Sequence, residues 1–191
     1  MDRDLGNTGR RRVGSESGAA AVEFALLLPL FAMLVIGLIS AGFTFHSWLS
    51  STHGAQESAR FAATLSIQAG GGSTDSWLAT VGERAFDASN LGTSATARAG
   101  SVVCVAIYAP GNKFPTTITP ARRVIFTADS NETVTAAYAA GTCPGMSPAA
   151  AGTDYVQVSV SRPSNFNFVL GSTQIQVEGK STSHYEAVAL S

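Results

Sequence analysis

Apolar residues are spread unevenly along the chain, and the longest apolar run lies near the N-terminus. Residues 24–45 are 22 consecutive positions without a formal charge, rich in Leu, Ile, Val, Phe and Ala. As a helix rising about 1.5 Å per residue, this run would be roughly 33 Å long, close to the roughly 30 Å hydrocarbon core of a bilayer. Core helices of soluble proteins are usually shorter and amphipathic. The pattern predicts one transmembrane helix, which we place at residues 19–45.

Small residues recur every four positions beyond the apolar run, which predicts that the helix continues over residues 46–69. These positions are Ser47, Ser51, Ala55, Ala59 and Ala63, and Gly37 with Ala41 has the same spacing within the apolar run. Small side chains at this interval form a groove in which another helix can pack closely. Packing of the same stripe against the chain's own domain is the alternative. Three glycines in "QAGGGSTDS" should end the helix.

A second helix is predicted between residues 75 and 90, within a linker and helix segment of residues 70–100. Ser73, Thr74 or Asp75 would cap its N-terminus. Five apolar residues fall on one face at helical spacing: Trp77, Leu78, Val81, Ala85 and Phe86. We expect this face to cover a sheet.

The apolar pattern changes to a period of two after Gly100, which predicts β-strands. Five segments have this character: 101–109, 122–128, 132–139, 154–161 and 173–180. In the fourth, Val156, Val158 and Val160 alternate with polar residues, as in a sheet with one buried face. Helices followed by a run of strands predict an α+β fold with an antiparallel sheet. The pattern leaves the strand order open.

The distribution of charge gives the orientation of the transmembrane helix. Four arginines precede residue 13, whereas no Lys or Arg follows the apolar run until Arg60. The positive-inside rule therefore places the N-terminus in the cytoplasm and residues 46–191 outside it. These residues are enough for a domain with its own core. A cleaved secretory signal peptide is less suitable, because the run is too long and contains Pro29.

Composition and motifs exclude several classes of function. Only 13% of the 191 residues are charged and the formal net charge is −1, so nucleic acid is not an expected partner. The chain contains no GxSxG, HExxH or phosphate-loop motif, and we expect no enzymatic activity, cofactor or metal. Cys104 and Cys143 both lie on the exported side, where disulfides persist. Their pairing would stabilise the fold by roughly 4 kcal/mol, and two buried free thiols are the alternative.

Glu23 is the one acid in the apolar stretch "GAAAVEFALLLPLF". A carboxylate at the bilayer centre costs about 2.5–3.5 kcal/mol, and less near an interface. Glu23 would lie at the cytoplasmic edge, where it could simply reach water. However, Gly18 precedes it by five positions and follows a polar, basic segment. Cleavage after Gly18 would make Ala19 the new N-terminus and Glu23 the fifth residue of the mature chain.

This arrangement resembles the type IV pilin class, and more closely the TadE-like family, the minor pseudopilins of Tad (tight adherence) pilus systems. The segments that carry the resemblance are "SESGAAAVEFALLLPLFAMLVIGLISAG" and "AQESARFAATLS", within residues 15–66. It implies a pilin-like fold and cleavage between Gly18 and Ala19 by a prepilin peptidase. It also implies that Glu23 and Phe24 dock onto a neighbouring subunit, with Glu23 meeting that subunit's N-terminal amine.

The resemblance implies further partners: other pilins or pseudopilins, the inner-membrane pilus assembly platform and the lipid bilayer. It places the protein in the bacterial cytoplasmic membrane as a single-pass protein, with possible incorporation into a pilus. The alternative is an uncleaved membrane-anchored accessory or binding protein of an envelope or secretion system. The mass of the mature protein distinguishes the two.

Overall fold

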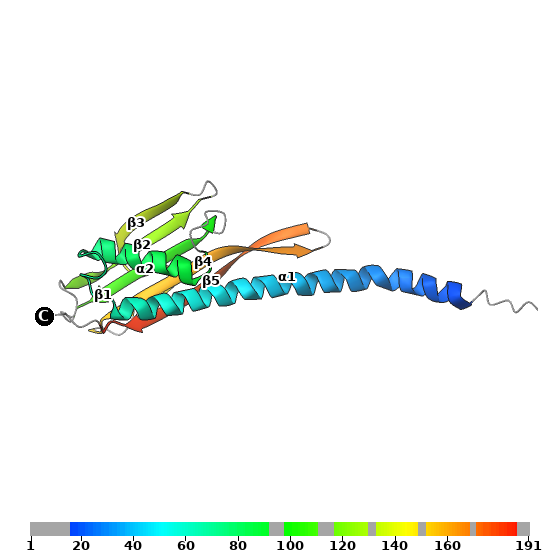
Figure 1. The fold of residues 1–191 in the computed structure, drawn as a ribbon, viewed down its shortest axis with the longest axis horizontal. Helices are drawn as coiled ribbons and strands as arrows, with labels where there is room; N and C mark the ends of the chain where they lie inside the picture. Colours follow the sequence, from blue (N-terminus) through cyan, green and yellow to red (C-terminus); the bar gives the residue numbers. More distant parts are fainter. Residues whose placement is uncertain are drawn as a thin grey trace, which may run out of the picture.

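A single long helix, α1 (Glu16–Thr64), is the dominant element of the molecule. The computed structural model describes residues 16–91, 98–110, 117–129, 133–148, 152–168 and 171–186. The N-terminal part of α1 extends far beyond the rest of the protein (Figure 1). Its C-terminal part packs against the remaining elements. The predicted continuation of the helix past residue 45 is confirmed, and the helix ends at Thr64, a few residues before the glycines.

The second helix, α2 (Thr74–Ala88), forms where the apolar stripe predicts it. Ser73 is its N-cap, and its hydroxyl oxygen accepts a hydrogen bond from the backbone N–H of Ser76 at 3.1 Å. The predicted stripe is fully buried at Trp77, Leu78, Val81, Ala85 and Phe86. Its function as a cover for the sheet is confirmed.

Five strands form one antiparallel sheet with the order β3-β2-β1-β4-β5. The strands are β1 (Val102–Ala109), β2 (Ile118–Ala128), β3 (Val134–Ala140), β4 (Tyr155–Phe168) and β5 (Gly171–His184). Both helices lie on the same face of this sheet (Figure 1), with α1 over β4 and β5, and α2 over β1 and β2. The predicted α+β class is therefore confirmed.

The main core lies between the two helices and this face of the sheet. Alternate strand residues point into it, including Val103, Val105 and Ile107 of β1. Val156, Val158 and Val160 of β4 do the same, and all six side chains are fully buried. The core therefore joins the C-terminal half of α1 to the sheet as one body.

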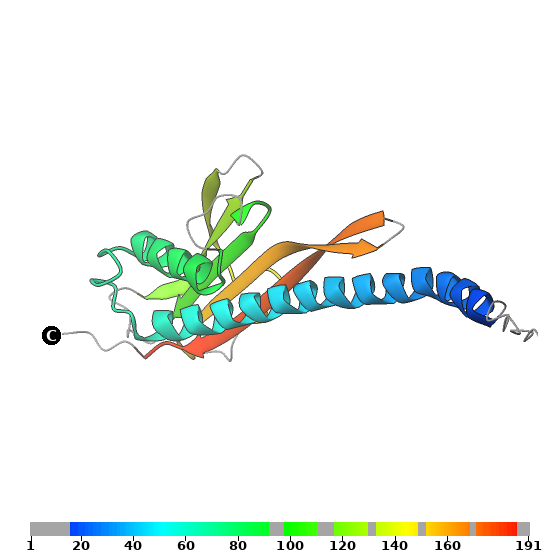
Figure 2. The ribbon, with the colours of Figure 1, turned by 45° about the vertical axis from the view of Figure 1, so that its right-hand side comes forward.

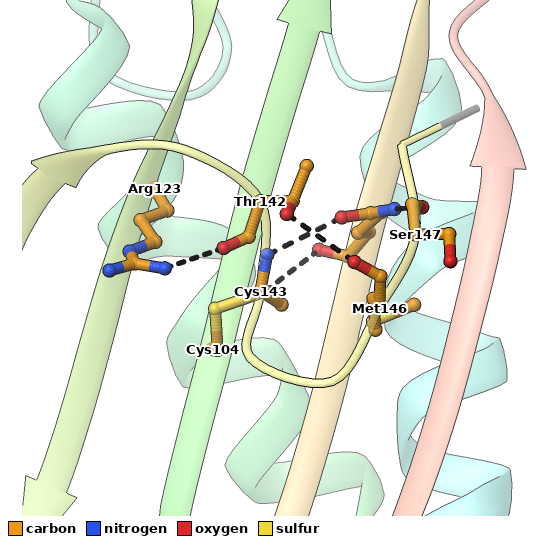
Figure 3. Close-up of a disulfide and its surroundings, with 7 residues drawn as sticks. Cys104, Arg123, Thr142, Cys143, Met146 and Ser147 are labelled. Carbon is orange, nitrogen blue, oxygen red and sulfur yellow. Dashed lines mark hydrogen bonds between the residues drawn. A yellow bond between two sulfur atoms is a disulfide. The ribbon is translucent and has the colours of Figure 1, made fainter. Parts of the chain in front are cut away.

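The opposite face of the sheet is also covered where it is formed by β1 and β4, which corrects the expectation of one buried face there. Cys104 of β1 is joined to Cys143, and the disulfide holds the loop of residues 141–148 across β1 and β4 (Figure 3). Gln157, expected to face solvent, is fully buried under this loop. Its amide oxygen accepts from the Cys143 N–H at 3.4 Å, and its amide nitrogen donates to the Ser147 carbonyl at 2.7 Å.

Strand lengths differ from the sequence prediction at two places. β2 begins at Ile118, before the predicted strand of residues 122–128, and passes through a cis Thr119–Pro120 bond. The pairing register between β1 and β2 shifts beside this point, and a proline fits an irregular ladder because it lacks an N–H. β4 and β5 are 14 residues each, so their hairpin is far longer than predicted.

Candidate processing and docking site

Gly18 and Ala19 lie in the first turns of α1, away from the folded domain. Both are exposed, as are all residues from 18 to 30. A Cβ atom built at Gly18 would meet no other part of the chain within 4 Å. The bond between Gly18 and Ala19 is therefore free of obstruction by the described part of the protein.

Glu23 and Phe24 follow within two turns of the same helix. Because Ala19 and Glu23 are four residues apart, their side chains lie on one face, about 6 Å apart along the axis. Glu23 is exposed and has no ion pair among the described residues. Phe24 is 66% exposed. The structure thus gathers all four predicted processing and docking residues on a short stretch of bare helix.

The apolar part of α1 is not covered by the chain itself. Its large apolar side chains between Val22 and Phe45 are 42–74% exposed, except that of Val35, which is partly buried. A continuous apolar surface of this kind indicates contact with lipid or with another protein. The helix is long and apolar enough to cross a membrane, which suggests a single-pass membrane anchor.

The small-residue stripe is buried in one part and not in the other. Ser51, Ala55, Ala59 and Ala63 are buried against the chain's own sheet and α2. At these positions the stripe therefore packs against the chain's own domain and not against another helix. Gly37 and Ala41 are not buried. Only this part of the stripe is open to a neighbouring helix.

One glycine that the sequence analysis did not select sets the distance between α1 and the sheet. A Cβ atom at Gly179 of β5 would overlap the backbone of Ser51 and Thr52. The helix therefore lies directly on β5 at this point. An isolated glycine inside a strand pattern is a signal of close backbone approach, and "TQIQVEGK" contains it.

Arg162 of β4, also not selected from the sequence, links three elements. Its guanidinium donates to the Ser47 hydroxyl at 2.9 Å and to the Ser89 carbonyl at 3.4 Å, at the C-terminal end of α2. Ser50 of α1 donates to the same carbonyl at 2.7 Å. Burial lowers the pKa of Arg162 from its ordinary value. A cation at this helix end is favoured by the helix dipole, so the contact stabilises the junction of α1, α2 and β4.

Comparison with known families identifies the segment that contains these residues. The model of the TadE-like protein family matches residues 18–60. The matched segment begins at Gly18 and ends inside α1, so the predicted resemblance is confirmed over this length. The match indicates a protein associated with Tad pili. Comparisons with curated proteins and with solved structures gave no match.

Proposed function

We propose that this protein is a TadE-like minor pseudopilin, a structural subunit that takes part in assembling a Tad-type pilus. The observation that carries the proposal is the arrangement at the start of α1. Gly18, Ala19, Glu23 and Phe24 lie together on exposed helix, ahead of an uncovered apolar segment. The match to the TadE-like family begins at the same residue.

In this proposal a prepilin peptidase cuts between Gly18 and Ala19 and releases the leader. The cut creates an ammonium group on Ala19. In the apolar surroundings of an assembled subunit, this ammonium and the Glu23 carboxylate would each be unfavourable alone, and pairing offsets that penalty. Ala19 and Glu23 of one chain are also within one helical turn, so pairing within a chain competes with pairing between neighbours.

The proposed location is the bacterial cytoplasmic membrane, with the N-terminus inside and the α+β domain outside. The basic residues before the apolar run and their absence after it support this orientation. The proposed partners are the prepilin peptidase, other pilins or pseudopilins and the assembly platform in the membrane. The proposed role is structural and not enzymatic.

Cleavage at Gly18 is the decisive test. The experiment expresses wild type, Gly18→Leu and the control Gly42→Leu together with a prepilin peptidase and measures the mass of each purified chain. A Cβ atom at either glycine meets nothing within 4 Å, so neither change disturbs the fold. We expect wild type and Gly42→Leu to lose residues 1–18, and Gly18→Leu to keep them.

An intact wild-type chain would overturn the pseudopilin assignment and favour the uncleaved membrane-anchored accessory protein. Normal shortening of Gly18→Leu would show that Gly18 is not the residue that the peptidase reads. In the first case the chain would lack the mature Ala19 amine on which the docking role of Glu23 depends.

A further inference from the structure

The β4–β5 hairpin extends beyond the other strands toward the apolar part of α1 (Figure 2). Two contacts fix its path along the helix. Arg162 reaches Ser47, and two residues further the Ser164 hydroxyl donates to the Thr44 hydroxyl at 3.3 Å. The hairpin therefore runs from the folded domain toward the N-terminal end of α1.

The remaining length of the hairpin sets how far it reaches. β4 continues for four residues beyond Ser164, to Phe168, which pairs with Gly171 of β5. At about 3.3 Å per strand residue this adds about 13 Å, equal to about nine residues of helix at 1.5 Å each. The tip thus reaches at most to the level of about residue 35 of α1.

The composition of the hairpin changes at the point where it leaves the domain. Residues 163–177 are 15 consecutive positions without a formal charge. Arg162 and Glu178 bracket this segment and lie at adjacent register positions on the paired strands. Its polar residues are only Asn, Gln, Ser and Thr, and its apolar ones include Phe166 and Ile175. Such a segment suits a layer in which charges are unfavourable but hydrogen bonds are available.

We propose that the tip of the β4–β5 hairpin lies in the outer interfacial layer of the membrane and contacts lipid headgroups and the upper acyl chains. The proposal rests on the membrane anchoring of α1. Because the hairpin is fixed to α1 within one chain, its tip meets this layer in every copy whose α1 spans the membrane. Phe43 and Phe45 of α1 are 68% and 58% exposed. Along the helix they lie between the point where the hairpin leaves the domain and the level of its tip, which is where aromatic residues of a membrane interface are expected.

The depth of the tip has a physical limit. A two-stranded hairpin has edges with unpaired backbone N–H and C=O groups, which the hydrocarbon core does not tolerate. The tip therefore stays above that core, so the outer boundary of the core lies no further out than the level of the tip, closer to the N-terminus of α1 than the expected residue 45. Residues 19–35 of α1 are about 26 Å long, within the range of lengths that cross a bilayer.

Position-specific fluorescence in membranes tests the inference. The full-length protein, its disulfide left oxidised, is reconstituted into vesicles of phosphatidylcholine and phosphatidylglycerol. An environment-sensitive fluorophore is attached to a single new cysteine at Ser172→Cys, at Leu30→Cys in α1, or at Thr135→Cys on β3; Ser172 and Thr135 are both exposed. Spin-labelled lipids then quench at the headgroup, at the upper acyl chain or at the bilayer centre.

We expect headgroup and upper-acyl quenchers to act at least about twofold more strongly on the Ser172 label than on the Thr135 label, since only the former lies in the interfacial layer. The Leu30 label should respond to the bilayer-centre quencher. Gln174→Cys, two residues further from the tip and also exposed, should give an intermediate value.

The labels separate failure of the inference from failure of the anchor. An unquenched Leu30 label would overturn the anchoring itself. A quenched Leu30 label together with equal, weak quenching at Ser172 and Thr135 would overturn the position of the hairpin. If the Ser172 signal instead rises with protein density and ignores the lipid quenchers, a second copy covers the tip and the lipid proposal is wrong.

Discussion

At the scale of single residues, two aromatic side chains close the C-terminal end of α1. The Trp77 indole N–H and the Tyr185 hydroxyl both donate to the Leu65 carbonyl, at 2.9 and 3.1 Å. Their rings meet edge to face with centroids 6.1 Å apart. Carbonyls at a helix end have no partner within the helix, so buried donors here are stabilising. The contact joins α1, α2 and the segment after β5.

The buried hydroxyl of Tyr185 predicts a loss of stability at alkaline pH. Burial, and secondarily the charge of Asp154, raise the pKa of Tyr185 to about 12. The ordinary tyrosine pKa is about 10, so between about pH 10 and 12 the unfolded chain loses this proton while the folded chain keeps it. The contribution is complete below pH 10 and disappears by about pH 12, with a total on the order of 2 kcal/mol. Urea unfolding of the full chain in micelles at several pH values measures it.

Two variants control this prediction. Tyr185→Phe should reduce stability by about 1 kcal/mol at neutral pH and flatten the alkaline decline. Tyr138→Phe, at a residue that is 41% exposed, should leave the decline as in wild type. An unchanged decline in Tyr185→Phe would assign the effect to another group.

At the scale of elements, the docking of α1 on the sheet depends on Gly179. Because a side chain there would overlap the backbone of Ser51 and Thr52, Gly179→Ala must push the helix and β5 apart. Overpacking of this kind costs about 1–3 kcal/mol. We expect the urea midpoint of the α+β domain to fall accordingly. Thr182→Ala, at an exposed position of the same strand, should change the midpoint little. Equal midpoints for the two variants would contradict the prediction, because they would mean that α1 can move away from β5 without loss of stability.

The elements differ in how far the sequence predicts them. The buried face of α2 can be predicted from a short stretch of sequence, because the helical spacing of Trp77, Val81 and Phe86 is enough to identify it. The burial of Gln157 was not predictable, because its partners come from a loop 10–14 residues away that the disulfide holds in place. Gly179 was visible as an unusual strand residue, but the element that approaches it lies more than 120 residues earlier in the chain.

The hairpin and the small-residue stripe were also only partly predictable from the sequence. The Asn and Phe residues at the end of β4 lack the alternating pattern with Val that marked residues 154–161, so the strand was predicted too short. The spacing of Ser51, Ala55 and Ala59 predicted a close contact but not its partner. The residues of the candidate site could be selected from the sequence because the proposed function depends on their order along one helix, from Gly18 to Phe24.

At the scale of the whole molecule, one continuous helix connects the proposed docking site to the α+β domain. The core fixes its C-terminal half, and Arg162 with Ser47 and Ser89 closes the junction where the helix leaves the domain. Described residues 18–30 make no buried contacts, so a change there should act on partners and not on the fold.

Because residues 18–30 do not contribute to the fold, substitution of Glu23 tests assembly without disturbing the folded domain. Glu23→Ala removes a charge from an apolar segment, so membrane insertion should be as good or better. Cleavage after Gly18 should survive, because the bond lies five residues earlier. Association with the neighbouring subunit should fail, because its Ala19 ammonium would be buried without a counter-charge. Breaking a buried pair in this way costs on the order of 3–5 kcal/mol, which corresponds to a loss of more than about a hundredfold in affinity.

The measurement is crosslinking to pilus components, with piliation, at equal membrane levels of processed protein. Glu57→Gln is the matched control, since Glu57 is an exposed acid on the same helix but within the α+β domain. We expect Glu23→Ala to accumulate as a processed membrane protein with little crosslinking, and Glu57→Gln to behave as wild type. A second variant, Glu23→Asp, keeps the charge and should restore part of the crosslinking. Unchanged crosslinking in Glu23→Ala would mean that this carboxylate only reaches water at the cytoplasmic interface.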